Sequence, residues 1–432
     1  MIPIDILLGS LYRGGEMKIL HTSDWHLGRA LYGKARHEEF QAFLDWLAEI
    51  IELRDIDVLL VAGDIFDTNT PSHRAQALYY QFLCRVAASP CRHIVIIAGN
   101  HDSPSFLNAP KDLLKALDVH VVGGGSADLN DEVLVLRNQQ QQAELIVCAV
   151  PYLRDRDIRT ATAGESIDDK NQKLLEGIRS HYAAAAELAV QKREGLDLHV
   201  PIIAMGHLFT AGGTIIDGDG VRDLYVGSTP HVASSIFSPV FDYVALGHLH
   251  VPQKVNNTEH IRYSGSPIPM GFGEAKQQKS ICELSFDVST QEGSANTVTV
   301  ELIQVPVFQM LESIKGDWHA ISSRIAELSA AGANVWLEII YEGDELLIDL
   351  RERVDLITAD TALDVLRIKN NRVIDRILEQ RHEEEMLDDL TEHEVFERCL
   401  DAHSVPDHQR SELVNTYQET LLSLIEDDPQ AV

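Results

Sequence analysis

The 432-residue chain is short of positive charge, because 36 Lys and Arg face 67 Asp and Glu, a formal net charge of −31. This deficit argues against a protein that coats nucleic acid or anionic membrane through its overall field. A local binding site is still compatible with it, because charges farther away than the Debye length, about 8 Å at physiological salt, are largely screened.

Long apolar runs and paired cysteines are also lacking. No run approaches the ~20 apolar residues of a transmembrane helix, so no membrane contact is expected. The five cysteines form no Cys-x-x-Cys pair, which argues against a zinc ribbon and indicates a reduced, cytoplasmic setting. Residues 1–16 lack the features of a signal peptide, and Met17 opens the first apolar run directly. We therefore expect residues 1–16 to be an N-terminal extension that is not native.

The length and the apolar patterning indicate more than one domain. Residues 17–295 alternate short apolar runs with amphipathic helices, which predicts an α/β domain. Residues 296–375 indicate a small α+β capping domain that begins with a strand at Thr299–Val305. Residues 376–432 hold a charged linker and two amphipathic helices. These helices either pack back on the body or dock on a partner protein.

Five apolar runs in the first domain each lead directly into metal-ligand residues. Runs this short and this rich in β-branched residues are typical of buried strands. Polar groups at the end of a buried strand cost free energy unless something holds them. The five segments are Asp24-Trp25-His26, Gly63-Asp64-Ile65-Phe66-Asp67, Gly99-Asn100-His101-Asp102, Gly206-His207 and Gly247-His248-Leu249-His250.

Ligands of α/β sheets bind at the carboxyl ends of strands, so we expect these segments to meet around metal ions. The candidate ligands are Asp24, His26, Asp64, Asn100, His207, His248 and His250. Seven donors suit two octahedral ions with a bridging carboxylate, whereas one zinc ion takes about four. Carboxylate, amide and imidazole donors without sulfur favour Mn²⁺ or Fe²⁺, and we expect two divalent ions, Mn²⁺ first.

The motif set D-x-H, G-D-x-x-D, G-N-H-D, G-H and G-H-x-H resembles that of the calcineurin-like metallophosphoesterases. The resemblance runs from Met17 to about Gly273 and implies a two-sheet sandwich flanked by helices. It also implies the ligand sets, with Asp64 as the bridge. One ion would be held by Asp24, His26, Asp64 and His250, and the other by Asp64, Asn100, His207 and His248.

Longer stretches are similar to the family of bacterial SbcD exonuclease subunits. They are Ile19–Gly28, Ala62–Asp67, Ala98–Ser103 and Tyr263–Pro269, and the similarity extends over nearly the whole chain after Met17. This resemblance implies a Mn²⁺-dependent nuclease that cuts DNA ends and hairpins in repair, recombination and replication. It also implies a coiled-coil ATPase of the SbcC type as partner of the C-terminal helices, and a homodimer within a heterotetramer.

Two residues beside the ligands are candidates for catalysis. His101 follows a metal-ligand Asn and cannot easily reach the same ion, so we expect it to donate a proton or hydrogen bond to the leaving oxygen or the phosphate. Asp67 could orient His101, since a carboxylate fixes a histidine tautomer. The alternative for Asp67 is that it caps the turn that follows it.

Three basic residues after the first motif, Arg29, Lys34 and Arg36, are candidate contacts to DNA phosphates.

Two other functions are compatible with the sequence. The first is hydrolysis of small molecules, cyclic nucleotides or phosphoproteins by the same chemistry. Phosphoprotein phosphatases carry Arg-Gly where Thr68-Asn69 follows Asp67 here, which argues against the last of these. The second is a scaffold that keeps the fold without its chemistry, and the intact donor set argues against that.

Overall fold

The computed structural model describes residues 16–158, 167–196, 200–210, 232–287 and 298–370, apart from 344, 346 and 348, together with six positions between 396 and 417. The chain forms two compact units that divide after Leu311. The expected N-terminal extension lies outside the described residues, apart from residue 16. No helix in the described segments is long and apolar enough to cross a bilayer.

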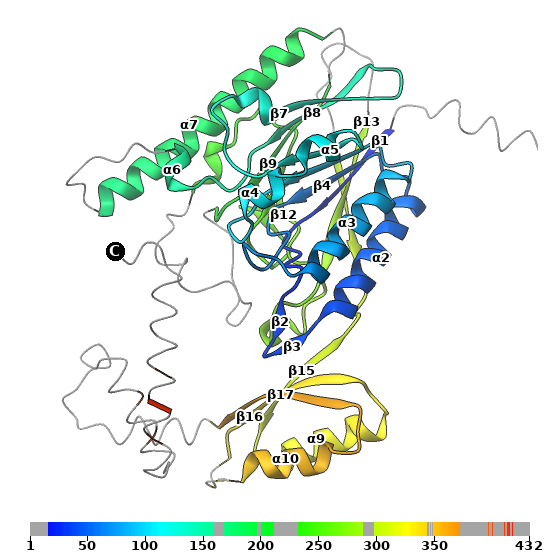
Figure 1. Ribbon diagram of the computed structural model, residues 1–432, viewed down its shortest axis with the longest axis vertical. Helices are drawn as coiled ribbons and strands as arrows, with labels where there is room; N and C mark the ends of the chain where they lie inside the picture. The colour runs from blue at the N-terminus through cyan, green and yellow to red at the C-terminus, as the bar shows by residue number, and fades with distance from the viewer. Residues whose placement is uncertain are drawn as a thin grey trace, which may run out of the picture. The chain divides into compact units, whose positions relative to one another are not determined.

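The first unit is a sandwich of two six-stranded sheets (Figure 1). The first sheet has the order β14-β13-β1-β4-β5-β6 and consists of β1 (Glu16–Thr22), β4 (Val58–Ala62), β5 (His93–Ile97), β6 (Val119–Val122), β13 (Ser280–Asp287) and β14 (Val298–Gln304). The second has the order β11-β12-β10-β9-β8-β7 and consists of β7 (Val133–Arg137), β8 (Ala143–Ala149), β9 (Ile202–His207), β10 (Tyr243–Gly247), β11 (Gln253–Val255) and β12 (Thr258–Tyr263).

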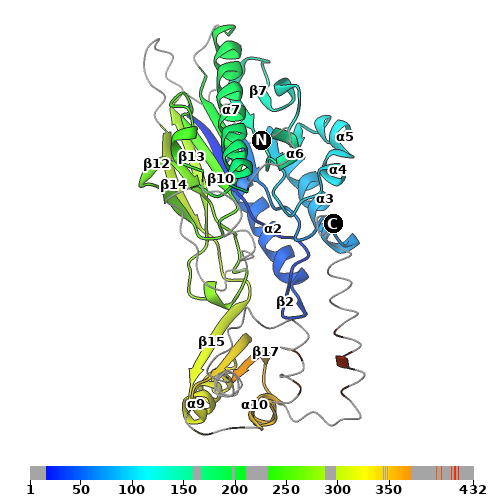
Figure 2. The same ribbon diagram turned by 90° about the vertical axis from the view of Figure 1, so that its left-hand side faces the viewer.

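Helices cover both outer faces of the sandwich (Figure 2). The helices α2 (His37–Leu53) and α3 (His73–Ala87) bury their apolar faces against the first sheet, and α7 (Ile167–Glu194) packs on the second. A third apolar layer fills the space between the sheets. The shorter elements of this unit are β2 (Ala30–Leu31), β3 (Lys34–Ala35), α4 (Pro104–Asn108), α5 (Lys111–Lys115), α6 (Asp155–Ile158) and the 3₁₀ turns Leu129–Asp131, Ser234–Ile236 and Phe272–Glu274.

The five apolar runs of the sequence form β1, β4, β5, β9 and β10. Every side chain of β4 and β5 is buried, as expected for parallel strands covered on both faces. Within each sheet these strands run parallel, so their carboxyl ends lie at a common edge. The expected two-sheet sandwich flanked by helices is therefore confirmed.

The expected start of the second domain at residue 296 is wrong. The strand that we assigned to that domain, β14, pairs antiparallel with β13 and forms the edge of the first sheet. The division between the units comes instead after Leu311. The alternating pattern of β14 fits an edge strand of either domain, because pairing partners are not written in a strand's own sequence.

The second unit has its own small core. It consists of β15 (Met310–Gly316), α9 (Trp318–Ala330), β16 (Val335–Tyr341), α10 (Leu350–Thr358) and β17 (Leu363–Asn370), with a three-stranded sheet of order β15-β16-β17. Ile321 and Ile325 of α9 pack against Leu337 and Ile339 of β16.

The segment 376–432 lies outside the described residues except for six positions, all of them helical. Among them, the rings of Phe396 and Tyr417 stack with their centroids 4.0 Å apart.

His21 on β1 is a buried neutral histidine that should limit stability in acid. Its ring lies between the Tyr243 hydroxyl and the Leu246 carbonyl, and burial lowers its pKa to about 3. The unfolded chain binds the proton at the ordinary value of about 6.5, so acid favours unfolding below that pH. We expect the free energy of unfolding of the wild type to fall by up to about 1.4 kcal/mol per pH unit more than that of His21→Gln between pH 6 and pH 4. Urea titrations across that range measure the difference, and parallel curves would contradict the prediction.

Candidate metal centre

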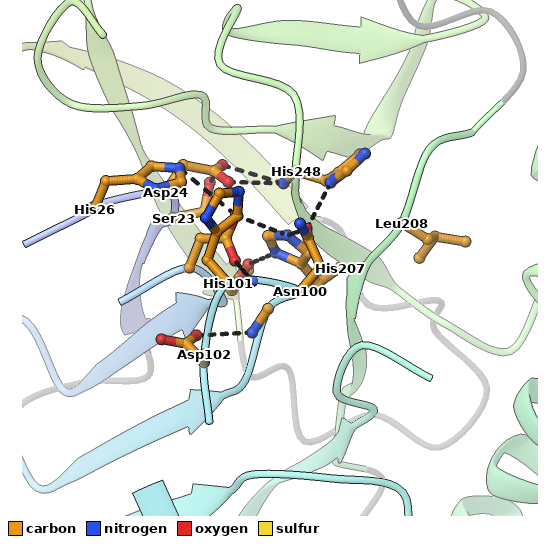
Figure 3. Close-up of polar contacts among 12 residues, drawn as sticks. Ser23, Asp24, His26, Asn100, His101, Asp102, His207, Leu208 and His248 are labelled. Carbon is orange, nitrogen blue, oxygen red and sulfur yellow. Dashed lines mark hydrogen bonds and ion pairs between the residues drawn. The ribbon is translucent and has the colours of Figure 1, made fainter. Parts of the chain in front are cut away.

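The seven candidate ligands lie at or just after the carboxyl ends of β1, β4 and β5 in the first sheet and of β9 and β10 in the second, where the two sheets face each other. Figure 3 shows the side chains of Asp24, Asn100, His207 and His248 turned toward one another. Five of the seven ligands are at most 3% exposed, namely Asp24, His26, Asp64, His207 and His250. Two groups of three, Asp24-His26-His250 and Asp24-Asp64-His207, each have ligand atoms within 4.8 Å of one another.

Asp64 lies between the two halves of the cluster. Its Oδ2 is 3.6 Å from His26 Nε2 on one side and 3.3 Å from His207 Nε2 on the other. The Oδ1 of Asn100 lies 3.0 Å from both His207 Nε2 and His248 Nδ1. The position of Asp64 between these groups is the one expected of a carboxylate that bridges two ions.

Four of the ligands have left-handed backbone conformations. The φ angles are 54° at Asp24, 48° at His26, 51° at Asp64 and 103° at His248. Non-glycine residues adopt this region at a cost and only where the surroundings enforce it, which is common at functional sites. Hydrogen bonds between the loops enforce it here, because the Asp24 and His26 amides donate to the carbonyls of Gly63 and Asp64.

Two motif glycines are required by space as well as by turn geometry. Gly63 has φ of +87°, and a Cβ there would collide with the His207 ring. A Cβ at Gly247 would collide with the carbonyl of Ala62 on the facing sheet. The glycines thus let the two sheets approach closely at the ligands.

The lone pairs of the cluster point at one another, which fits a cation. His207 Nδ1 lies 2.9 Å from the Ala62 carbonyl, which can only accept, so Nδ1 carries the proton of the neutral ring. Nε2 faces two oxygens, the Oδ1 of Asn100 at 3.0 Å and the Oδ2 of Asp64 at 3.3 Å, so it needs a proton or a cation between them. His26 Nε2 and His250 Nε2 also lie only 3.1 Å apart, with room for one proton at most. Metal ions at these places would satisfy these atoms by coordination.

The pKa values of the histidines in the cluster also fit a metal site. Burial lowers the pKa of His26 to about 4 and that of His248 to about 3, so both rings are neutral ligands at physiological pH. Burial also works against a charged His207, but the carboxylates of Asp64 and Asp24 raise its pKa to about 9. A proton thus takes the place at His207 that a metal ion would take.

Two buried carboxylates that we assigned no role hold the ligands in position. Asp102 accepts hydrogen bonds from the amides of Gly99, Ile65 and Phe66 and so ties the second motif to the third. Its pKa is raised to about 6, first by burial and then by Asp64.

The second of these carboxylates, Glu274, lies with Oε1 3.5 Å from His250 Nδ1 and is paired with Lys279. A carboxylate behind a ligand histidine orients the ring and raises its basicity. The position of Asp102 inside the third motif could have revealed its importance, whereas no motif points to Glu274.

The structure changes the expected role of Asp67. Its backbone carbonyl, and not its carboxylate, lies 2.9 Å from His101 Nδ1. The carboxylate faces His26 Nδ1 at 3.3 Å and Arg29 at 3.2 Å. Asp67 therefore orients His101 through its backbone and His26 through its carboxylate.

The three candidate phosphate contacts have different surroundings. Arg36 is only 1% exposed and forms a two-pronged ion pair with Glu39, so its expected contact with DNA is wrong. Glu39, in the first turn of α2, binds the Arg36 guanidinium, and the position of Arg36 in the sequence does not reveal this contact. Lys34 is exposed at the start of β3, and Arg29 is half-buried beside Asp67.

An apolar recess opens beside two of the candidate ligands, His207 and His248. Tyr152, Leu153 and Phe209 contribute to its wall. The recess has the size and chemistry to take part of a substrate next to the cluster.

Comparisons with known proteins agree with this geometry. The family model of the calcineurin-like phosphoesterases matches residues 17–252, and that of the "Type 5 capsule protein repressor C-terminal domain" matches residues 307–404. The SbcD subunit of the SbcCD nuclease from Escherichia coli K12 is 36% identical over 414 residues, which cover 94% of this chain and 98% of that protein. The chain belongs to the SbcD family of calcineurin-like phosphoesterases.

Other relatives are more distant or shorter in their match. The SbcD protein of Rhodobacter capsulatus is 39% identical over 265 residues, or 60% of this chain and 64% of that protein. A solved dimetal phosphatase from Danio rerio is 10% identical with a TM-score of 0.38, covering 67% of this chain and 98% of that chain.

Membership in the SbcD family confirms the resemblance that the motifs indicated. Phosphoesterases of this family use divalent metal ions, and the donor chemistry of the cluster fits such ions.

Proposed function

We propose that this chain is the nuclease component of an SbcCD-type complex and hydrolyses DNA phosphodiester bonds with two divalent metal ions. The observation that carries the proposal is the position of the Asp64 carboxylate between His26 and His207 and beside Asp24, in a chain that matches the E. coli SbcD protein over nearly its full length. Mn²⁺ is the proposed metal, because the donor set mixes carboxylate, amide and imidazole without sulfur. Exonuclease action on duplex ends and endonuclease action on hairpins are part of the proposal.

The protein side of the reaction follows from the positions of the side chains. Asp24, His26, Asp64 and His250 would hold one ion, and Asp64, Asn100, His207 and His248 the other. Bound there, the ions would supply an acidified water and offset the charge of the phosphate. His101 projects beside the cluster, with its ring 4.9 Å from that of His26, and its Nδ1 proton is fixed by the Asp67 carbonyl. Its Nε2 is therefore the atom that would meet the leaving oxygen or the phosphate.

The recess beside His207 and His248 supports a nucleic-acid substrate. Its aromatic and aliphatic wall suits the apolar surface of a sugar or base, and aromatic side chains such as Tyr152 and Phe209 stack on any base. The alternative substrate, a small or cyclic phosphodiester, would use the same donors. It gives no reason for the second unit or for the match to the SbcD family beyond residue 252.

An end-labelled duplex, a hairpin and a chromogenic diester separate these possibilities. We expect Mn²⁺-dependent cleavage of both DNA substrates, increased by the ATPase partner with ATP. Calcium in place of manganese is the matched control, since Ca²⁺ occupies oxygen sites with a looser geometry. Cleavage of the diester but never of DNA, even with the partner present, would favour the alternative.

We also propose that the C-terminal helices bind the coiled-coil ATPase, and that two copies of the chain form a homodimer in the cytoplasm. The described cysteines are free, which supports a reducing compartment. Phe396 and Tyr417 stack, while Leu413 is 40% exposed and available to a partner. Undiminished co-purification of the ATPase with a chain that ends near residue 386 would contradict the docking role.

Lys34 should contribute one phosphate contact. We expect Lys34→Ala to weaken binding to duplexes of any sequence and to reduce the slope of log affinity against log salt by about 0.9. Lys254→Ala is the matched control, because this exposed lysine lies on β11, in the second sheet. Equal salt slopes for the two variants would remove Lys34 from the interface.

A further inference from the structure

A second cluster of metal-ligand side chains lies at the other end of the first sheet. His93 is the first residue of β5, whereas Asn100 follows the last. His120 lies on the neighbouring strand β6, and Asp118 directly precedes that strand. One ligand atom from each of His93, Asp118 and His120 lies within 4.8 Å of the other two. This cluster shares no residue with the candidate metal centre.

The strand register places the three side chains on one face. Val95 is opposite His120, and the amide of Ile94 donates to the carbonyl of Asp118 at 3.1 Å. Because side chains alternate along a strand, His93 and His120 share the face of Val95, which packs in the layer between the two sheets. The cluster thus lies where that layer ends, beside β7 of the second sheet.

The hydrogen bonds of His93 prepare one nitrogen as a ligand. Its Nε2 lies 2.8 Å from the carbonyl of Arg137, which can only accept, so the proton of the neutral ring is on Nε2. The Nδ1 lone pair is buried, in a residue 7% exposed, and meets no hydrogen-bond partner among the described residues. A backbone carbonyl behind a histidine is a common way to fix a metal ligand.

His120 presents a second buried nitrogen. Its Nε2 also lacks a hydrogen-bond partner in the described part of the chain. Burial lowers the pKa of His120 to about 4. His93 and Lys115 also lower this pKa, whereas Asp118 raises it. The ring is therefore neutral at physiological pH. Glu144 lies 3.8 Å from His93 Nε2, and Arg92 binds that glutamate, so the nearby charges include both signs.

We propose that His93, Asp118 and His120 bind one divalent transition-metal ion of the zinc class. Two imidazole nitrogens and one carboxylate, without sulfur, match the ligands of Zn²⁺, and water supplies the fourth position of a tetrahedron. The ion links β5 to β6 at the edge of the sandwich and satisfies two nitrogens that otherwise cost free energy in the interior. The site lies at the end of β5 opposite the candidate metal centre, so it takes no part in the proposed hydrolysis.

Metal counting tests the site without any activity measurement. The full chain is loaded with Zn²⁺, passed through a desalting column and analysed for zinc per chain. We expect His120→Ala and His93→Gln each to carry one zinc fewer than the wild type, with the affinity for that ion lowered by at least about a hundredfold. Asp112→Asn, a nearby exposed carboxylate on α5, and His319→Ala, an exposed histidine of α9, should keep the wild-type count.

Asp118→Asn is a third variant that should fold normally, because the Asp118 side chain is exposed and its replacement does not disturb the core. We expect it to lower the affinity for the same single ion while the circular dichroism spectrum stays that of the wild type. Zinc counts that are equal in the wild type and in all three cluster variants would overturn the proposal and leave a bridging water between the two nitrogens. That result would not touch the proposed nuclease activity, which needs none of these residues.

Discussion

His101→Ala is expected to lower the turnover of DNA hydrolysis by about a hundredfold or more while both catalytic metal ions stay bound. General acid or hydrogen-bond donation by a positioned side chain contributes about 10²–10⁴ to a rate. His101 is positioned from two sides, because its Nδ1 faces the Asp67 carbonyl and its amide donates to Asp64 Oδ1 at 2.9 Å. The substitution removes the ring and keeps the amide, so the contact with Asp64 survives.

The metal count decides between two roles for His101. Its ring also groups with His26 and Asp64 within ligand distance, so loss of an ion in His101→Ala would make it a ligand and contradict the role of donor. His260→Ala, on β12, is the matched control and should keep the wild-type rate and metal content.

The sequence points to the candidate ligands because each of them lies at or just after the end of a strand. Each ligand follows a short apolar run, and a buried strand that ends in Asp or His signals its site before any contact is known. Parallel strands then bring Asp24, Asp64 and Asn100 to one sheet edge. That β9 and β10 belong to a second sheet facing this edge was implied by the family resemblance and is not written in the five runs themselves. This depends on packing across the middle apolar layer.

The contacts that support the ligands were harder to predict than the ligands themselves. Glu274 lies 24 residues after His250 and reaches it only because the 3₁₀ turn Phe272–Glu274 folds back. His101 meets the backbone carbonyl of Asp67 and not its carboxylate, and Arg36 is held by its ion pair with Glu39. Such contacts are set by side-chain geometry after the fold has formed, and residue type and spacing carry little of that information.

Asp64→Asn is expected to lower hydrolysis by about a thousandfold or more and to reduce the binding of both ions. Asn has nearly the same shape as Asp and can still accept the His101 amide, so the change removes charge and little else. The Asp64 carboxylate lies within 3.6 Å of a ligand histidine on each side. Burial alone would raise the pKa of Asp64, but the neighbouring His207 holds it well below its usual range. The site therefore strongly favours the ionised form of Asp64. Charge stabilisation by metal ions is worth several kcal/mol, and about 4 kcal/mol corresponds to a thousandfold.

The neighbouring carboxylate of Asp67 provides the control for Asp64→Asn. Asp67→Asn also removes one negative charge near His26, but this carboxylate faces the Nδ1 side of His26 and Arg29, and the backbone contact of Asp67 with His101 is kept. Partners that orient a ligand typically cost about 10–100-fold in metal affinity or activity when they are changed. We therefore expect two ions in Asp67→Asn and a smaller loss of rate than in Asp64→Asn, with both variants folded by circular dichroism. If Asp64→Asn instead kept two ions and a rate within tenfold of the wild type, Asp64 would not bridge two metals, and the proposed two-metal hydrolysis would have to be abandoned.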